Sequence, residues 1–203
     1  MIATFVDYGA GNLRSLRAAF ERTGAEVAVA DRPEEVATAS FVVIPGVGQA
    51  AAAMEALRDR DLVDAIMGAV RGGARLFGVC VGMQLLFARS EEGETAGLGL
   101  LPGSATRLEG ARRLPHMGWN DVEPAGAHPL TEAFPAPCYF AHSYAVQDAA
   151  PRCVLASTPV ERGGFASLVG DDRVAGAQFH PERSGAAGAA FLRAVVKWAD
   201  HAA

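Results

Sequence analysis

The first 79 residues alternate between short apolar runs and longer segments with helical patterning. The apolar runs predict strands at residues 2–6, 27–30, 41–44 and 75–79. The segments between them have helical spacing or capping signals and predict helices over residues 13–20, 35–39, 50–58 and 62–71. Strands that alternate with helices in this way build a parallel sheet through right-handed crossovers. This part of the chain therefore predicts an α/β fold.

The pattern changes after residue 90, where shorter segments are separated by proline and glycine. These segments predict antiparallel strands at residues 105–108, 118–122, 138–144, 153–157, 165–169 and 174–179, with a hairpin turn at 170–172. A last helix is predicted over residues 187–200. With 203 residues, 50% of them hydrophobic, the chain can bury one substantial core. We predict one α/β domain over residues 1–203, with an open, mostly parallel central sheet, flanking helices and an antiparallel extension in the C-terminal half.

Charge and hydropathy argue against two classes of partner. The chain carries 18 basic and 23 acidic residues, so it has no basic footprint for nucleic acid. No uncharged apolar run reaches the roughly 18 residues that a membrane helix needs. Residues 1–7 lack the basic start of a secretory signal. We therefore expect a cytoplasmic protein that binds neither nucleic acid nor membrane.

The cysteines indicate no disulfide framework and no metal centre. There are three of them, Cys80, Cys138 and Cys153, and none has Cys-x-x-Cys spacing. This arrangement predicts neither a disulfide framework nor a zinc site, and it fits a reducing compartment. We predict no metal and no cofactor.

One cysteine lies in a pattern that favours a nucleophile. Cys80 is at the centre of Gly78-Val79-Cys80-Val81-Gly82, directly after a predicted strand and before an amphipathic segment, residues 83–89, that predicts a helix. The glycines permit a sharp, strained turn that exposes the side chain between them. The positive end of the following helix would favour the thiolate. The alternative is a small buried cysteine in a βα loop.

A thiolate nucleophile needs a base and a group that orients the base. His180 follows the apolar strand 175–179, where Pro181 marks the strand end, and Glu182 is two residues away. The three side chains of Cys80, His180 and Glu182 would form a Cys-His-Glu triad from separate loops. The alternatives are a histidine that caps a strand and an ordinary surface acid.

Acyl transfer also needs donors for the developing oxyanion. The backbone N–H of Val81, the residue after the nucleophile, is one candidate donor. The second is the Gly-rich turn at residues 45–48, which follows a predicted parallel strand, where open α/β sheets place their sites. The alternative for this turn is a simple βα loop, and it lacks the Gly-x-Gly-x-x-Gly pattern of dinucleotide sites.

Six segments, taken in chain order, resemble a known family. They are residues 7–15 (DYGAGNLRS), 45–48 (PGVG), 78–84 (GVCVGMQ), 117–120 (MGWN), 139–144 (YFAHSY) and 178–184 (QFHPERS). Together they resemble the glutaminase subunits of imidazole glycerol phosphate synthase, which are class I (triad) glutamine amidotransferases. The cysteine and the His-Pro-Glu pair indicate only the superfamily, and the remaining segments narrow the resemblance to this branch of histidine biosynthesis.

The resemblance implies a role for each matching residue. Cys80 would attack the side-chain amide of glutamine, His180 would protonate the departing ammonia and then activate water, and Glu182 would hold His180. The implied oxyanion hole comprises Gly46, Val47 and Val81. The implied glutamine-binding residues are Gln84, Glu92, His142 and Ser143.

The resemblance also implies a partner. Ammonia would pass to a (β/α)8 cyclase subunit that forms imidazole glycerol phosphate and aminoimidazole carboxamide ribotide. The residues that match the partner-facing surface are Asn12, Trp119, Tyr139 and Arg183. The Gly46–Val47 peptide would turn its N–H inward only when the partner holds its ribonucleotide.

Small departures from the family pattern occur at Val81, Ala141, Ala145 and Arg183. Ala145 and Arg183 concern the partner-facing surface. The family pattern has lysine at the position of Arg183, and arginine and lysine are not interchangeable where geometry matters. Three other functions remain as alternatives: a glutaminase that serves another synthase, a cysteine hydrolase that acts alone, and a non-catalytic subunit that only binds its partner.

Overall fold

An eight-stranded sheet forms the centre of the molecule in the computed structural model, which describes residues 1–9, 13–132 and 137–200. In spatial order its strands are β2 (Glu26–Ala30), β1 (Ile2–Val6), β3 (Phe41–Ile44), β4 (Arg75–Val79), β14 (Val174–Ala177), β13 (Gly164–Gly170), β12 (Val154–Pro159) and β9 (Glu123–Pro124). The strands from β2 to β14 are parallel, and β13, β12 and β9 continue the sheet in antiparallel pairing. The predicted fold class, with its antiparallel extension, is confirmed.

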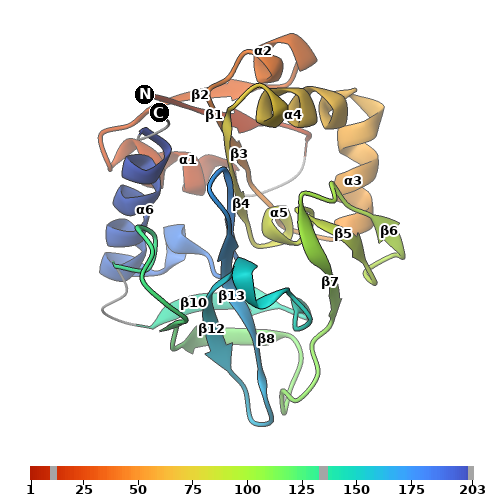
Figure 1. Cartoon of the computed structure of the whole chain (residues 1–203), viewed down its shortest axis with the longest axis vertical. Coiled ribbons are helices and arrows are strands. Elements are labelled where there is room, and N and C mark those ends of the chain that lie inside the picture. Colours follow the sequence, from red (N-terminus) through yellow and green to blue (C-terminus); the bar gives the residue numbers. More distant parts are fainter. Residues whose placement is uncertain (10–12, 133–136, 201–203) are drawn as a thin grey trace.

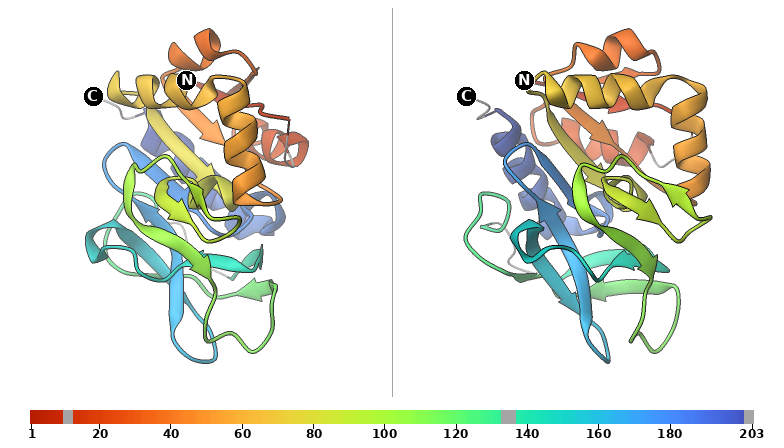
Figure 2. Two further views of the ribbon diagram at one scale, coloured as in Figure 1. Left: turned by 90° about the vertical axis from the view of Figure 1, so that its right-hand side faces the viewer. Right: turned by 45° about the vertical axis from the view of Figure 1, so that its right-hand side comes forward.

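Helices cover both faces of the parallel part. They are α1 (Leu13–Glu21), α2 (Pro33–Ala37), α3 (Ala50–Asp59), α4 (Leu62–Arg71) and α6 (Gly185–Asp200). Right-handed crossovers place α1 on the face opposite to α2, α3 and α4. In agreement with this, α1 contacts α6, whereas α4 contacts α2 and α3 (Figures 1 and 2). Among the described residues, no helix is long and apolar enough to cross a membrane.

Two smaller sheets lie beside the antiparallel half of the large sheet (Figure 1). One comprises β11 (Tyr144–Val146), β7 (Leu101–Arg107), β5 (Phe87–Ser90) and β6 (Thr95–Ala96), and the other comprises β10 (Cys138–His142) and β8 (His116–Asn120). Three single turns complete the fold: α5 (Val81–Gln84) and the 3-10 turns η1 (Pro151–Cys153) and η2 (Pro181–Arg183).

The prediction of a helix over residues 83–89 is wrong. Its helical part, α5, ends at Gln84, and residues 87–90 form strand β5. The reason is non-local: Leu100 and Leu101 both donate their backbone N–H to the carbonyl of Leu86, at 2.8 and 3.0 Å. This carbonyl is therefore not available to continue a helix, and the chain pairs with β7 instead.

The segment predicted as an antiparallel strand over residues 174–179 is β14, which ends at Ala177 and pairs with β4 in parallel. Several other predicted elements have different boundaries, and two of them show why. The strand predicted over residues 138–144 is interrupted at Ser143, because β10 pairs with β8 whereas β11 pairs with β7 in another sheet. The short helix predicted over residues 35–39 occupies 33–37 instead, and Arg32 precedes it without a side-chain cap.

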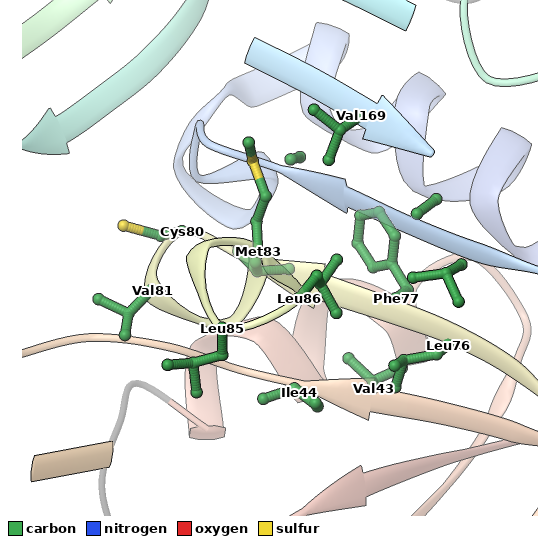
Figure 3. Close-up of a cluster of buried hydrophobic side chains, with 14 of the residues drawn as sticks. Val43, Ile44, Leu76, Phe77, Cys80, Val81, Met83, Leu85, Leu86 and Val169 are labelled. Carbon is green, nitrogen blue, oxygen red and sulfur yellow. The ribbon is translucent and has the colours of Figure 1, made fainter. Parts of the chain in front are cut away.

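Buried apolar side chains hold the α5 turn against the sheet. Figure 3 shows Leu85 and Leu86 on the side of Ile44 of β3, whereas Met83 extends toward Val169 of β13. The sulfur of Cys80, at the start of the turn, points away from this cluster (Figure 3). The core thus fixes the turn, and the thiol, although Cys80 is only 3% exposed, lies on the side away from the cluster.

Candidate active site

Cys80 has a strained backbone conformation at the end of β4. Its φ is 54° and its ψ is −110°, which a residue with a Cβ adopts only at a cost. A Cβ on Gly78 would lie 2.4 Å from the oxygen of Gly82, and a Cβ on Gly82 would lie 2.1 Å from the oxygen of Ile44. Both flanking positions therefore require glycine, as the sequence pattern predicts.

The following helix contributes less to the thiolate than the sequence suggests. Because α5 has only 4 residues, it carries little macrodipole. The N–H groups at the start of such a turn nevertheless have no acceptor within it. Val81, which supplies one of them, lines the pocket in front of Cys80.

His180 lies just beyond the end of β14, and its backbone is held on both sides. Its N–H donates to the carbonyl of Tyr139 at 2.8 Å, and its carbonyl accepts the hydroxyl of Ser184 at 2.7 Å. The side-chain Nδ1 is 3.0 Å from Oε1 of Glu182, and both side chains are almost fully buried. Cys80 and His180 line the same pocket, and Cys80 is one of the groups that raise the pKa of the imidazole. The structure thus brings the three predicted triad residues together, with a hydrogen bond between His180 and Glu182.

The environment of His180 favours the imidazolium form. Burial alone lowers the pKa of His180, but the hydrogen bonds and charges of Cys80 and Glu182 outweigh burial and raise that pKa to about 10. At neutral pH the ring is therefore protonated between a carboxylate and a sulfur. A histidine in this state can give a proton to a leaving amine.

A pocket of about 220 Å³ opens in front of Cys80 and His180. Its lining includes these predicted site residues: Val47, Cys80, Val81, Gln84, Glu92, His142, Ser143, His180 and Arg183. Glu182 lies behind His180 and does not line the pocket. The predicted catalytic, oxyanion and glutamine-binding residues therefore surround one cavity, except for Gly46 and Glu182, which are not part of its lining.

The turn at residues 45–48 packs directly on the cysteine turn. A Cβ on Gly46 would lie 2.1 Å from the backbone nitrogen of Gly82, so the two turns touch through their backbones. The buried hydroxyl of Tyr8 donates to the carbonyl of Pro45 at 2.7 Å. Burial, and then the nearby Cys80 and Asp7, raise the pKa of Tyr8, which keeps this donor protonated. The sequence analysis gave Tyr8 no role, although it lies in a segment that carries the resemblance.

Two buried acceptors in the pocket have no hydrogen-bond partner among the described residues. The carbonyl of Tyr144 accepts from Nε2 of Gln84 at 2.9 Å and lies 2.9 Å from Nδ1 of His142. A carbonyl only accepts, so Nδ1 carries the proton and Nε2 of His142 is an acceptor. Burial, together with the nearby His116, lowers the pKa of His142 to about 3, so the ring is neutral. The unpartnered atoms are Oε1 of Gln84 and Nε2 of His142.

Glu92 and Gln178 complete the surroundings of the pocket. Oε2 of Glu92 accepts the backbone N–H of Ala50 at 2.9 Å, which holds its carboxylate at the pocket wall. Nε2 of Gln178, which the sequence analysis did not single out, lies 3.6 Å from the sulfur of Cys80. The described part of the chain holds no cluster of side chains suited to a metal ion.

Three of the four residues predicted to face a partner lie together at the surface. Trp119 is 59% exposed and its ring centroid is 6.1 Å from that of Tyr139. The guanidinium of Arg183 lies 4.2 Å from the centroid of the Tyr139 ring. These residues come from β8, β10 and η2, and β8 and β10 are paired strands (Figure 1). Asn12 lies outside the described residues.

A family model described as glutamine amidotransferase class-I matches residues 4–197. The chain belongs to the class I glutamine amidotransferases. Among curated amidotransferases, the imidazole glycerol phosphate synthase subunit HisH of Symbiobacterium thermophilum is 45% identical over 196 residues, which are 95% of this chain and 91% of that protein. The HisH subunit of Mycolicibacterium paratuberculosis is 46% identical and covers 93% of each chain. These identities place the chain in the HisH branch of the amidotransferases.

Solved amidotransferase structures share the fold at lower identity. A crystal structure of a glutamine amidotransferase superposes with a TM-score of 0.75 at 20% identity, covering 97% of this chain and 98% of that one. The structure of PurLQS from Thermotoga maritima gives a TM-score of 0.73 at 21% identity, covering 97% and 98%. At such identities these structures support the amidotransferase fold alone.

Proposed function

We propose that this amidotransferase hydrolyses glutamine to glutamate and ammonia with Cys80, His180 and Glu182. The ammonia is delivered to a (β/α)8 cyclase subunit, which forms imidazole glycerol phosphate and aminoimidazole carboxamide ribotide. The observation that carries the proposal is the buried His180–Glu182 pair at 3.0 Å, with His180 lining the same pocket as Cys80. The relatives named as imidazole glycerol phosphate synthase subunits support the choice of synthase.

In the first half of the reaction, the sulfur of Cys80 attacks the side-chain amide carbon of glutamine. A C–S bond forms, the carbonyl π electrons move to the oxygen, and the backbone N–H groups of Val81 and Val47 stabilise that oxyanion. The carbonyl then re-forms as the C–N bond breaks, and His180 gives its proton to the departing ammonia. The product is a γ-glutamyl thioester on Cys80.

In the second half, neutral His180 removes a proton from a water molecule as the water attacks the thioester carbon. The C–S bond breaks, glutamate leaves, and the sulfur returns as a thiolate beside the imidazolium. Glu182 accepts the Nδ1–H of His180 throughout, so it keeps the ring oriented and stabilises its charged form.

The pocket offers complementary groups for a free amino acid. The carboxylate of Glu92 fits the α-ammonium group, and Ser143 fits the α-carboxylate through its backbone. The unpartnered acceptors of Gln84 and His142 fit N–H donors of the substrate. These assignments explain why the buried acceptors lack protein partners.

We further propose that Trp119, Tyr139 and Arg183, together with Asn12, contact the cyclase. An exposed tryptophan beside a tyrosine and an arginine has the composition of a binding hot spot. Delivery must avoid bulk water, because ammonia in neutral water becomes ammonium and is no longer a nucleophile. The family match over residues 4–197 supports our proposal that this part of the chain forms one domain.

The test measures glutamate release from glutamine by the isolated chain, by the chain with purified cyclase, and by the complex with the cyclase's ribonucleotide substrate. We expect low release by the isolated chain and about a hundredfold increase in the loaded complex, which requires about 2.7 kcal/mol of coupling. High release by the isolated chain, unchanged by partner and ligand, would indicate a hydrolase that acts alone. No release under any condition would indicate a non-catalytic subunit.

A further inference from the structure

Gln178 links the nucleophile to a residue of the proposed glutamine site. Its side chain is 0% exposed and its backbone N–H donates to the carbonyl of Ser167 at 2.9 Å, so its position is fixed. Its Nε2 lies 3.6 Å from the sulfur of Cys80, and its Oε1 lies 3.0 Å from Nε2 of Gln84. A buried carboxamide therefore contacts the reacting sulfur with its donor end.

The orientation of this carboxamide follows from a backbone group. The carbonyl of Tyr144 can only accept, so the NH2 end of Gln84 must face it. The second N–H of that group then needs an acceptor, and Oε1 of Gln178 is the one within reach. The NH2 end of Gln178 must consequently face Cys80. The carbonyl of Tyr144 thus sets the direction of every hydrogen bond from the pocket wall to the sulfur.

We propose that Gln178 is a further catalytic residue, whose amide N–H donates to the Cys80 sulfur and stabilises the thiolate. An ionised sulfur is a stronger acceptor than a thiol, so this donor favours the charged form. The donor matters here because α5, with 4 residues, supplies little helix dipole. Gln178 transfers no proton: as the C–S bond forms, negative charge leaves the sulfur for the amide oxygen and the hydrogen bond from Gln178 weakens.

The same carboxamide also holds a glutamine-binding residue in place. By accepting the second N–H of Gln84, Gln178 keeps Oε1 of Gln84 unpartnered. One side chain therefore fixes both the nucleophile and a substrate acceptor. The second role, toward glutamine, depends on the proposed function, whereas the effect on the thiolate does not.

The test compares Gln178→Glu and Gln178→Met with the parent chain in the rate of Cys80 alkylation by iodoacetamide between pH 6 and 9. All three cysteines are buried and only Cys80 lines the pocket, so peptide mapping is used to follow Cys80 separately from Cys138 and Cys153. Gln178→Glu keeps the acceptor for Gln84 and replaces only the donor that faces Cys80. Gln178→Met removes the donor without adding charge. It provides the test if the buried carboxylate of Gln178→Glu prevents folding. Gln147→Glu, at an exposed position, is the matched charge control.

We expect alkylation at pH 7 to fall about tenfold in both Gln178 variants, the size of one hydrogen bond to a charged group. The rate profile should shift to higher pH by about one unit, which is the same tenfold effect. The Gln147 control should keep the parent profile. A folded Gln178→Met chain with the parent profile would overturn the proposal. Because alkylation uses no glutamine, this outcome is independent of whether the chain is a glutaminase.

Discussion

The contribution of Glu182 can be separated from that of His180 by two substitutions. Glu182→Gln keeps an oxygen that can accept the Nδ1–H of His180 but removes the negative charge that faces the ring at 3.0 Å. His180→Ala removes the ring that makes both proton transfers in the proposed reaction. If Glu182 acts only by orienting and stabilising the ring, the first substitution must cost less activity than the second.

The expected sizes follow from the contacts. A hydrogen bond to a charged group contributes about 1.5–3 kcal/mol, so Glu182→Gln should lower kcat/KM about 10- to 150-fold. General acid–base catalysis alone contributes about 10²–10⁴-fold, and His180→Ala also removes the counter-ion of the thiolate. We therefore expect His180→Ala to lower kcat/KM by about 10⁴-fold or more.

The assay is glutamate release by the complete synthase with saturating ribonucleotide, together with circular dichroism of both variants to establish that they fold. A His180→Gln variant serves as a control, because it fills much of the ring's volume without its chemistry. Equal losses for Glu182→Gln and His180→Ala in folded proteins would refute the reasoning. That result would assign Glu182 a direct part in proton transfer.

Three further predictions concern stability and binding. The raised pKa of His180, about 10 against an ordinary value of 6.5, adds stability that is complete below pH 6.5 and disappears as pH rises through 10. In urea titrations Glu182→Gln should therefore be less stable than the parent at pH 6 and equal to it above pH 10. A difference in stability that persists above pH 10 would contradict this cause. Gly82→Ala would place a Cβ 2.1 Å from the oxygen of Ile44, and calorimetry should show about 1–3 kcal/mol of destabilisation. The control, Gly68→Ala, is at an open helical position and should be neutral or slightly stabilising. An unchanged melting temperature for Gly82→Ala would mean that the turn adapts. Trp119→Ala should weaken cyclase binding about 30-fold in titration calorimetry, and Val29→Ala, exposed on the sheet edge, should not; equal Kd values for Trp119→Ala and the parent would move the interface elsewhere.

The parallel half of the fold could be predicted because its signal is local. All four residues of β3, for example, are buried and apolar, so the strand is visible in the sequence itself. The end of α5 could not be predicted, because it depends on the hydrogen bonds that the backbone N–H groups of Leu100 and Leu101 donate to the Leu86 carbonyl. The break at Ser143 likewise depends on which sheet each half of the segment joins.

The candidate site divides in the same way. The turn at Cys80 and the His180–Glu182 pair have short-range signatures, namely flanking glycines and a spacing of two residues. The contact between Gln178 and Cys80 joins positions 98 residues apart, and no local pattern reports it. The hydroxyl of Tyr8 on the Pro45 carbonyl, 37 residues apart, was missed for the same reason.

The most direct test of the central claim measures synthesis by the complete synthase with either glutamine or ammonia as the nitrogen source. In the Cys80→Ala variant we expect glutamine-dependent synthesis to be lost and ammonia-dependent synthesis to remain, because the cyclase needs only ammonia. Cys153→Ser, at a buried thiol outside the pocket lining, should keep both activities. Glutamine-dependent synthesis at the parent rate by Cys80→Ala would contradict the assignment of Cys80 as the nucleophile.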